Sequence, residues 1–115
     1  MKIRDIIGIL KAEILVEGNL DEEVKMACGS DMMSDVLACV TEDTLLLTGM
    51  VNSQCVRTCE MLDVPCVIFV RSKEPLADAL ALAREIGLPM LKTPYTMFES
   101  CARLYTAGLK PVELG

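Results

Sequence analysis

The chain has 115 residues, of which 52% are hydrophobic, and a formal net charge of −6. This length suits one compact domain over residues 1–115, and the apolar content excludes intrinsic disorder. The acidic charge and the scarcity of aromatic residues (two Tyr, two Phe, no Trp) argue against nucleic-acid binding. We find no signal peptide and no apolar stretch near the ~20 residues of a membrane span, so we expect a cytoplasmic protein without membrane contact.

Histidine is absent, which removes the Ser-His and Cys-His nucleophile pairs and every imidazole zinc site. The six cysteines show no CxxC spacing, so the strong zinc and iron–sulfur signatures are missing too. We therefore expect no catalytic residues, no metal site and no cofactor.

The first half of the chain predicts two helices and two strands before residue 44. Apolar side chains at positions 3, 6, 7 and 10 share one helical face. A strand over residues 12–16 follows, and alternating polarity over residues 24–28 indicates a half-buried or edge strand. Gly29 breaks that strand, and Ser30 or Asp31 is placed to cap a helix whose apolar face includes Met33 and Val36.

The second half alternates strands and helices more regularly. Residues 44–48 and 66–70 are short apolar runs, and the second is typical of a central parallel strand. A helix carrying Cys55 and Cys59 inward lies between them. The helix over residues 76–86 is expected to have Pro75 in its first turn and Gly87 as its C-cap. A strand over residues 88–91 precedes a last helix ending at Gly108, whose inward side is expected to hold the following residues: Met97, Phe98, Cys101, Leu104 and Tyr105.

This alternation predicts an α/β fold: a single three-layer-like domain with a mainly parallel sheet flanked by helices. Ligands of such sheets usually bind beyond the carboxyl ends of the strands. The residues at those ends offer hydroxyl groups, helix N-termini and positive charge, which suit a phosphate or a carboxylate. The candidate ligand-binding residues are Ser30, Asp31, Thr48, Gly49, Asn52, Arg71, Lys73, Lys92 and Thr93. The alternative is that these residues only cap helices, and neither a GxGxxG nor a P-loop pattern is present.

Two residue pairs at helical spacing offer other chemistry. Asp31 and Asp35 would share a helix face, as in a paired-carboxylate or hard-metal site, although charge at a helix start explains them equally. Cys55 and Cys59 could hold a metal or act in redox chemistry, although free cysteines on an apolar stripe usually pack in the core.

The apolar residues, eight Met among them, exceed what a small core must hide. The surplus can cover a self-association surface through Met32, Met33 or Met50, which predicts a homodimer. A loosely packed core is the alternative, because Met adapts to irregular packing.

Three segments together resemble the DRTGG domain family over nearly the whole chain. They are Gly29-Ser30-Asp31-Met32-Met33-Ser34-Asp35-Val36-Leu37, the stretch from Thr44 through Thr48-Gly49 to the strand 66–70, and Gly87-Leu88-Pro89 with Thr93-Pro94-Tyr95-Thr96-Met97-Phe98-Glu99. Related domains resemble the N-terminal part of HPr kinase/phosphorylase and occur beside CBS domains in some pyrophosphatases. The Asp-Arg-Thr-Gly-Gly string itself is absent, because Thr48-Gly49 is followed by Met50-Val51-Asn52.

The resemblance implies an accessory or regulatory domain that dimerises and has no established catalysis. We therefore expect a non-catalytic regulatory or protein-interaction domain, homodimeric or paired with a separately encoded protein. The alternative is a sensor that binds a nucleotide or other small anionic ligand at the strand ends. A third hypothesis is an enzyme or metal protein that uses Asp31 and Asp35 or Cys55 and Cys59.

Overall fold

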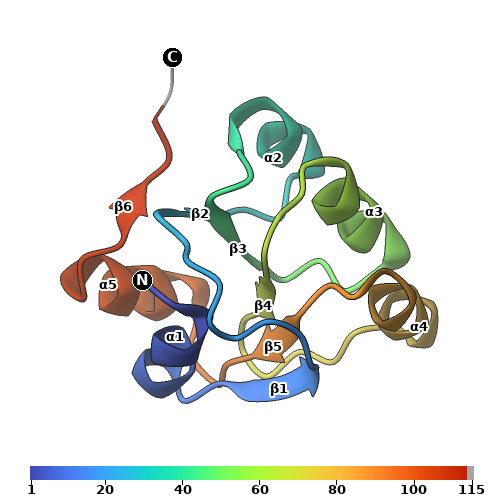
Figure 1. Ribbon diagram of the computed structural model, residues 1–115, viewed down its shortest axis with the longest axis horizontal. Helices are drawn as coiled ribbons and strands as arrows, with labels where there is room; N and C mark the ends of the chain where they lie inside the picture. Colours follow the sequence, from blue (N-terminus) through green and yellow to red (C-terminus); the bar gives the residue numbers. More distant parts are fainter. Residues whose placement is uncertain (114–115) are drawn as a thin grey trace.

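The computed structural model describes residues 1–113 and contains five helices and six strands (Figure 1). The helices are α1 (Ile3–Leu10), α2 (Met33–Cys39), α3 (Ser53–Met61), α4 (Ala77–Ile86) and α5 (Met97–Thr106). The strands are β1 (Glu13–Val16), β2 (Met26–Gly29), β3 (Thr44–Thr48), β4 (Val67–Phe69), β5 (Met90–Lys92) and β6 (Lys110–Pro111). Within residues 1–113, no helix is both long enough and apolar enough to cross a membrane.

All six strands form one sheet in the order β1-β5-β4-β3-β2-β6. Only β1 is antiparallel to its neighbour, β5, whereas every other pair is parallel. The carboxyl ends of β2, β3, β4 and β5 therefore meet at one edge of the sheet. The expected α/β fold with a mainly parallel sheet is confirmed.

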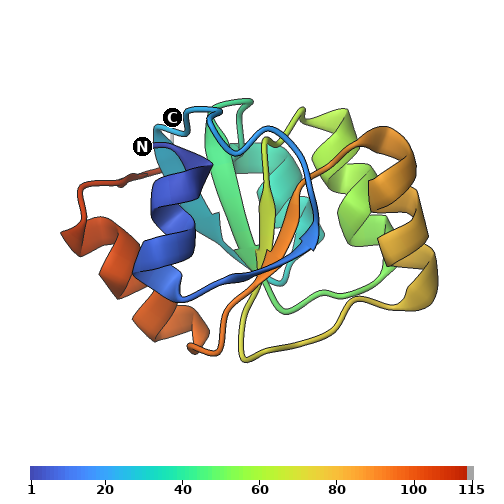
Figure 2. The ribbon, with the colours of Figure 1, turned by 60° about the horizontal axis from the view of Figure 1, so that its bottom comes forward.

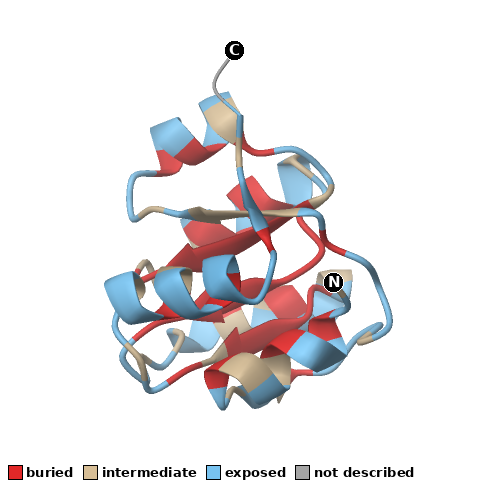
Figure 3. Ribbon diagram, turned by 90° about the vertical axis from the view of Figure 1, so that its left-hand side faces the viewer, coloured by how far each residue is buried: buried red, intermediate tan, exposed pale blue. Residues whose placement is uncertain are grey.

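Helices cover both faces of the sheet, as Figure 2 shows, with α1 and α5 on one side and α3 and α4 on the other. Alternate residues of β3 feed the two cores, because successive side chains of a strand point to opposite faces. Leu46 packs with residues of α2, α3 and α4, and Leu45 and Leu47 pack with α1 and α5. In Figure 3 the strands of the central sheet are buried, whereas the outward faces of the helices are exposed.

β3 and β4 are buried along their whole length, as their unbroken apolar sequences predict. The expected C-cap at Gly87 is also confirmed: its φ is 72° and its N–H bonds to Ala83 and Arg84 carbonyls. Such a left-handed cap favours glycine, which lacks a Cβ.

Two local predictions were wrong. Met32, not Ser30 or Asp31, is the N-cap of α2, because the Asp31 carboxylate bonds to the end of β3 instead. Pro75 lies outside α4, whose N-cap is Leu76. β2 is half-buried, which is one of the two predicted alternatives, and it is not an edge strand because the short strand β6 pairs with Met26 and Ala27.

Candidate functional site

A cleft of about 460 Å³ opens at the carboxyl ends of β2, β3 and β4, beside the start of α5. It lies where ligands of parallel sheets usually bind. Its lining residues are Gly29, Ser30, Asp31, Gly49, Val70, Arg71, Thr96, Met97 and Phe98. Four of the residues predicted from the sequence are among them: Ser30, Asp31, Gly49 and Arg71.

Asp31 ties the end of β2 to the end of β3. Its Oδ1 accepts a hydrogen bond of 2.6 Å from the Gly49 N–H and one of 3.3 Å from the Thr48 hydroxyl. The Ser30 hydroxyl makes a local turn, accepting from the Met32 N–H at 3.0 Å. Thr48 does not line the cleft, but its hydroxyl bond to Asp31 helps to hold that carboxylate in place.

The positive charge of the cleft comes from Arg71, which lies in the turn just after β4. Arg71 and Ser72 both have left-handed backbone, with φ of 56° and 52°. Their amides donate at 2.8 Å to the carbonyls of Tyr95 and Thr93, which holds this strained turn in place. Within residues 1–113, the Arg71 guanidinium has no ion pair or hydrogen bond. Arg71 is therefore available to a ligand.

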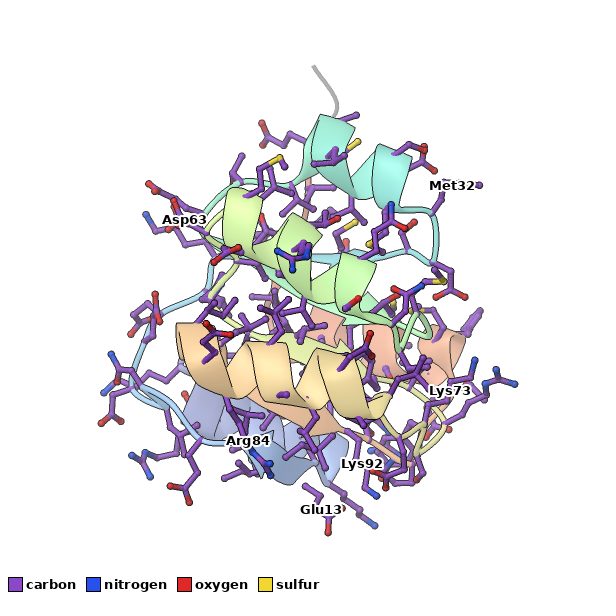
Figure 4. The ribbon with its side chains drawn as sticks, turned by 90° about the vertical axis from the view of Figure 1, so that its right-hand side faces the viewer. Glu13, Met32, Asp63, Lys73, Arg84 and Lys92 are labelled. Atoms are coloured by element: carbon purple, nitrogen blue, oxygen red, sulfur yellow. The ribbon has the colours of Figure 1, made fainter. Side chains whose placement is uncertain are left out.

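Lys73 contacts the end of β3 beside the cleft without lining the cleft itself. Its Nζ donates to the Gly49 carbonyl at 3.3 Å. A Cβ on Gly49 would lie 3.3 Å from both the Lys73 Nζ and the Asp31 Oδ1, so glycine lets these opposite charges flank the strand end. Figure 4 shows Lys73 and Met32 toward one side of the molecule, and Asp63 toward the other.

The remaining predicted residues lie elsewhere in the structure. The Asn52 side chain caps α3 by accepting from the Cys55 N–H at 3.1 Å. Lys92 lies between Glu13 and Glu74, and its hydrogen bonds to Glu74 and then Glu13 raise the Lys92 pKa. Thr93 is buried and donates to the Leu10 carbonyl at 2.6 Å. These three side chains serve structural contacts and do not line the cleft.

Sequence reasoning missed the wall that α5 contributes. It assigned Phe98 and Tyr105 to the inward side of the last helix, but Phe98 is 81% exposed and Tyr105 is 68% exposed. Leu104, by contrast, is buried as expected. Thr96 caps α5 by accepting from the Glu99 N–H, so Met97 and Phe98 lie in the first turn, next to the strand ends. The signal available in the sequence was an aromatic residue in the first turn of a helix that follows a strand end.

A second, largely apolar groove of about 420 Å³ lies between α5 and the strands β2 and β6. Phe98 and Gly29 line both this groove and the cleft, whereas Tyr105 lines the groove alone. α5 packs closely over β2 here, because a Cβ on Gly29 would lie 2.8 Å from the Met97 Sδ and 2.9 Å from the Cys101 Sγ.

The other candidate pairs do not form a metal cluster in the structure. Cys55 and Cys59 are both fully buried in the core, and a hydrogen bond with Cys55, together with burial, raises the Cys59 pKa far above its usual value. Among residues 1–113, no three His, Cys, Asp or Glu side chains group together as metal ligands. Of the three methionines considered for self-association, only Met32 is largely exposed, at 59%, and Met33 is a core residue.

Comparison with known proteins gave a family and a fold. No curated protein matches the chain. A solved structure of the CBS and DRTGG domains of the regulatory region of Clostridium perfringens pyrophosphatase, complexed with the activator diadenosine tetraphosphate, matches with a TM-score of 0.73 and 16% identity. The match covers 90% of this chain and 45% of that one, so this chain spans less than half of its neighbour. The model of the DRTGG domain matches residues 5–107, and the chain therefore belongs to the DRTGG domain family.

Proposed function

We propose that this chain is a non-catalytic regulatory domain that binds a small phosphate-bearing ligand in the strand-end cleft. The observation that carries the proposal is the Arg71 guanidinium, which lines the cleft and has no partner within residues 1–113. Arginine favours phosphate and carboxylate groups because its planar donors match two oxygens at once.

The polar groups of the cleft support binding better than catalysis. The Ser30 and Thr96 hydroxyls already bond to backbone N–H groups, and the Asp31 carboxylate holds the end of β3. A nucleophile needs a base within hydrogen-bond reach, and within residues 1–113 neither the Ser30 nor the Thr96 hydroxyl is hydrogen-bonded to an acidic or basic side chain. Incubation with nucleoside phosphates should therefore give no turnover.

The structural neighbour supports a regulatory role. Its DRTGG domain belongs to the regulatory region of a pyrophosphatase, and the crystals of that region contained a nucleotide activator. By analogy, we infer that this chain regulates another activity in response to a nucleotide or similar anion. Its six free cysteines suit a reducing compartment such as the cytoplasm.

Binding can be tested by calorimetry and thermal unfolding with pyrophosphate and AMP. A ligand at 100 times its Kd stabilises the folded state by about 2.7 kcal/mol, which raises Tm by several degrees. Arg71→Gln should abolish this shift, because it removes the cation. Arg84→Gln is the matched control, since Arg84 is an exposed residue of α4 outside the cleft. An equal loss of the ligand-induced Tm shift in Arg71→Gln and Arg84→Gln would contradict the proposed site.

Homodimerisation is a second candidate function, favoured by Tyr105, which is 68% exposed along the apolar groove. A second copy or a separately encoded protein would cover the part of the groove that is lined by Tyr105, Lys110 and Pro111. Sedimentation at micromolar concentrations should show a dimer that Tyr105→Asp disrupts. Met61→Asp is the control, because Met61 is 73% exposed on α3. A strict monomer at all concentrations would exclude the homodimer.

A further inference from the structure

The lining of the strand-end cleft combines two kinds of side chain, and together they restrict the ligand. The Arg71 cation and the polar residues Ser30 and Asp31 come from the strand ends. Met97 and Phe98 come from the start of α5. A ligand that contacts both groups of residues must therefore combine an anion with an apolar surface.

Asp31 adds a second requirement on the ligand, which is a hydrogen-bond donor for its free carboxylate oxygen. Its Oδ1 accepts both protein hydrogen bonds, from Gly49 and Thr48, and its Oδ2 has no donor within residues 1–113. A free carboxylate oxygen accepts from hydroxyl or amino groups and repels phosphate. A bare inorganic anion would leave this acceptor unused, whereas a ligand with hydroxyl groups beside its phosphate would satisfy it.

Phe98 supplies the third requirement. At 81% exposure it is the most exposed large hydrophobic side chain within residues 1–113, and it lines the cleft. An aromatic ring held on a helix beside an anion site offers a flat surface for a flat ligand group. Stacking of a nucleobase on such a ring strengthens binding by roughly 5- to 150-fold.

From these three features, and resting on the proposed function of the cleft, we propose that its ligand is a nucleoside phosphate. The phosphate pairs with Arg71, the ribose hydroxyls donate to Asp31, and the base stacks on Phe98. A volume of about 460 Å³ lies within the range of small-molecule sites. Phe98 is then the residue that distinguishes nucleotides from sugar phosphates.

The test compares AMP with ribose 5-phosphate, which has the same phosphate and a sugar but no base. Calorimetric titration of the full chain should show AMP binding at least about fivefold more tightly than ribose 5-phosphate. Phe98→Ala should reduce this ratio to near one by weakening AMP alone, and Phe98→Tyr should restore it. Arg71→Gln should weaken both ligands.

Met61→Ala is the control, because Met61 is a large hydrophobic residue, 73% exposed on α3, that lines neither the cleft nor the groove. It should leave both affinities unchanged. If the wild type binds ribose 5-phosphate as tightly as AMP, and Arg71→Gln weakens both, the anion site stands and the nucleoside inference is wrong. If neither ligand binds at millimolar concentration, the proposed function of the cleft fails as well. A loss of AMP binding in Met61→Ala equal to that in Phe98→Ala would also overturn the role of Phe98.

Discussion

Asp31 illustrates how one residue links local structure to the candidate site. Its position after β2 allowed either helix capping or a site role, and its actual contacts run across the sheet to Gly49 and Thr48. Hydrogen bonds to a charged group contribute more than neutral ones, about 1.5–3 kcal/mol each, and less where solvent reaches them. Asp31 therefore fixes the geometry of the cleft through one carboxylate oxygen.

Asp31→Ala should lower the free energy of unfolding by about 1–3 kcal/mol, because the Gly49 N–H and the Thr48 hydroxyl lose their acceptor. Asp31→Asn keeps an acceptor oxygen and should cost less. Urea unfolding of each variant measures the change. Asp35→Ala is the control, since Asp35 is exposed in the first turn of α2 and should cost at most about 1 kcal/mol. Equal losses for Asp31→Ala and Asp35→Ala would contradict a bridging role for Asp31.

At the scale of elements, three glycines have different surroundings, which determine what an added Cβ would do. Gly8 is exposed within α1 and has open space where a Cβ would lie, whereas Gly87 closes α4 at a φ of 72°. Gly29 lies under α5, where a Cβ would meet the Met97 and Cys101 sulfur atoms. The same substitution should therefore have opposite effects at these positions.

Gly8→Ala should stabilise the fold by about 0.5–1 kcal/mol, because alanine has the higher helix propensity. Gly87→Ala should destabilise it by about 1 kcal/mol, because the left-handed cap disfavours a Cβ. Gly29→Ala should cost about 1–3 kcal/mol through overpacking against α5. Thermal unfolding of the three variants checks the order, and a stabilising Gly29→Ala would show that α5 does not pack closely on β2.

Most helices and strands were predictable because their apolar residues recur at the positions that face the core. α1 was found from Ile3, Ile6 and Leu10, all of which are fully buried. β6 was missed because Lys110 and Pro111 carry no strand signal, and only tertiary contact with β2 pairs them. The outward position of Phe98 was missed for a related reason: which side of α5 faces the sheet depends on packing that periodicity alone does not determine.

The candidate site was partly predictable by the same reasoning. Topology brings strand ends together, so Ser30, Asp31, Gly49 and Arg71 could be grouped without coordinates. Lys92 was indistinguishable from Arg71 in sequence. Its pairing with Glu13 depends on the antiparallel strand β1, which the alternating pattern does not reveal, and its pairing with Glu74 depends on the course of the loop after β4.

For the whole molecule, the cysteines predict how stability depends on pH. Burial raises the pKa of the Cys66 thiol, and a hydrogen bond with Cys55 followed by burial raises that of Cys59. Burial also raises the pKa of Cys28 and Cys101. The Cys59 and Cys66 thiols stay protonated in the folded chain at a pH where the unfolded chain ionises, near the ordinary cysteine pKa of about 8.5. The folded state then binds more protons, so its stability is complete below that pH and falls as the pH rises above it.

Urea unfolding between pH 7.5 and 9.5 under reducing conditions should show this loss, about 1.4 kcal/mol at pH 9.5 for each of Cys59 and Cys66. Cys59→Ala should lower the absolute stability and flatten the pH dependence. The Lys92 pKa is also raised, so its contribution is lost only at higher pH, outside this window. Stability that stays constant to pH 9.5 would contradict buried, neutral thiols in the folded chain.

The central claim is that the carboxyl ends of the strands form a ligand site, and an NMR titration with AMP tests it most directly. We expect the amide shifts that move to cluster at Gly29–Asp31, Gly49, Arg71 and the start of α5, which line the cleft. The loops around Asp63 and Gly87, at the opposite ends of the strands, should stay unchanged. Shifts confined to those loops, or none at millimolar AMP, would contradict the account.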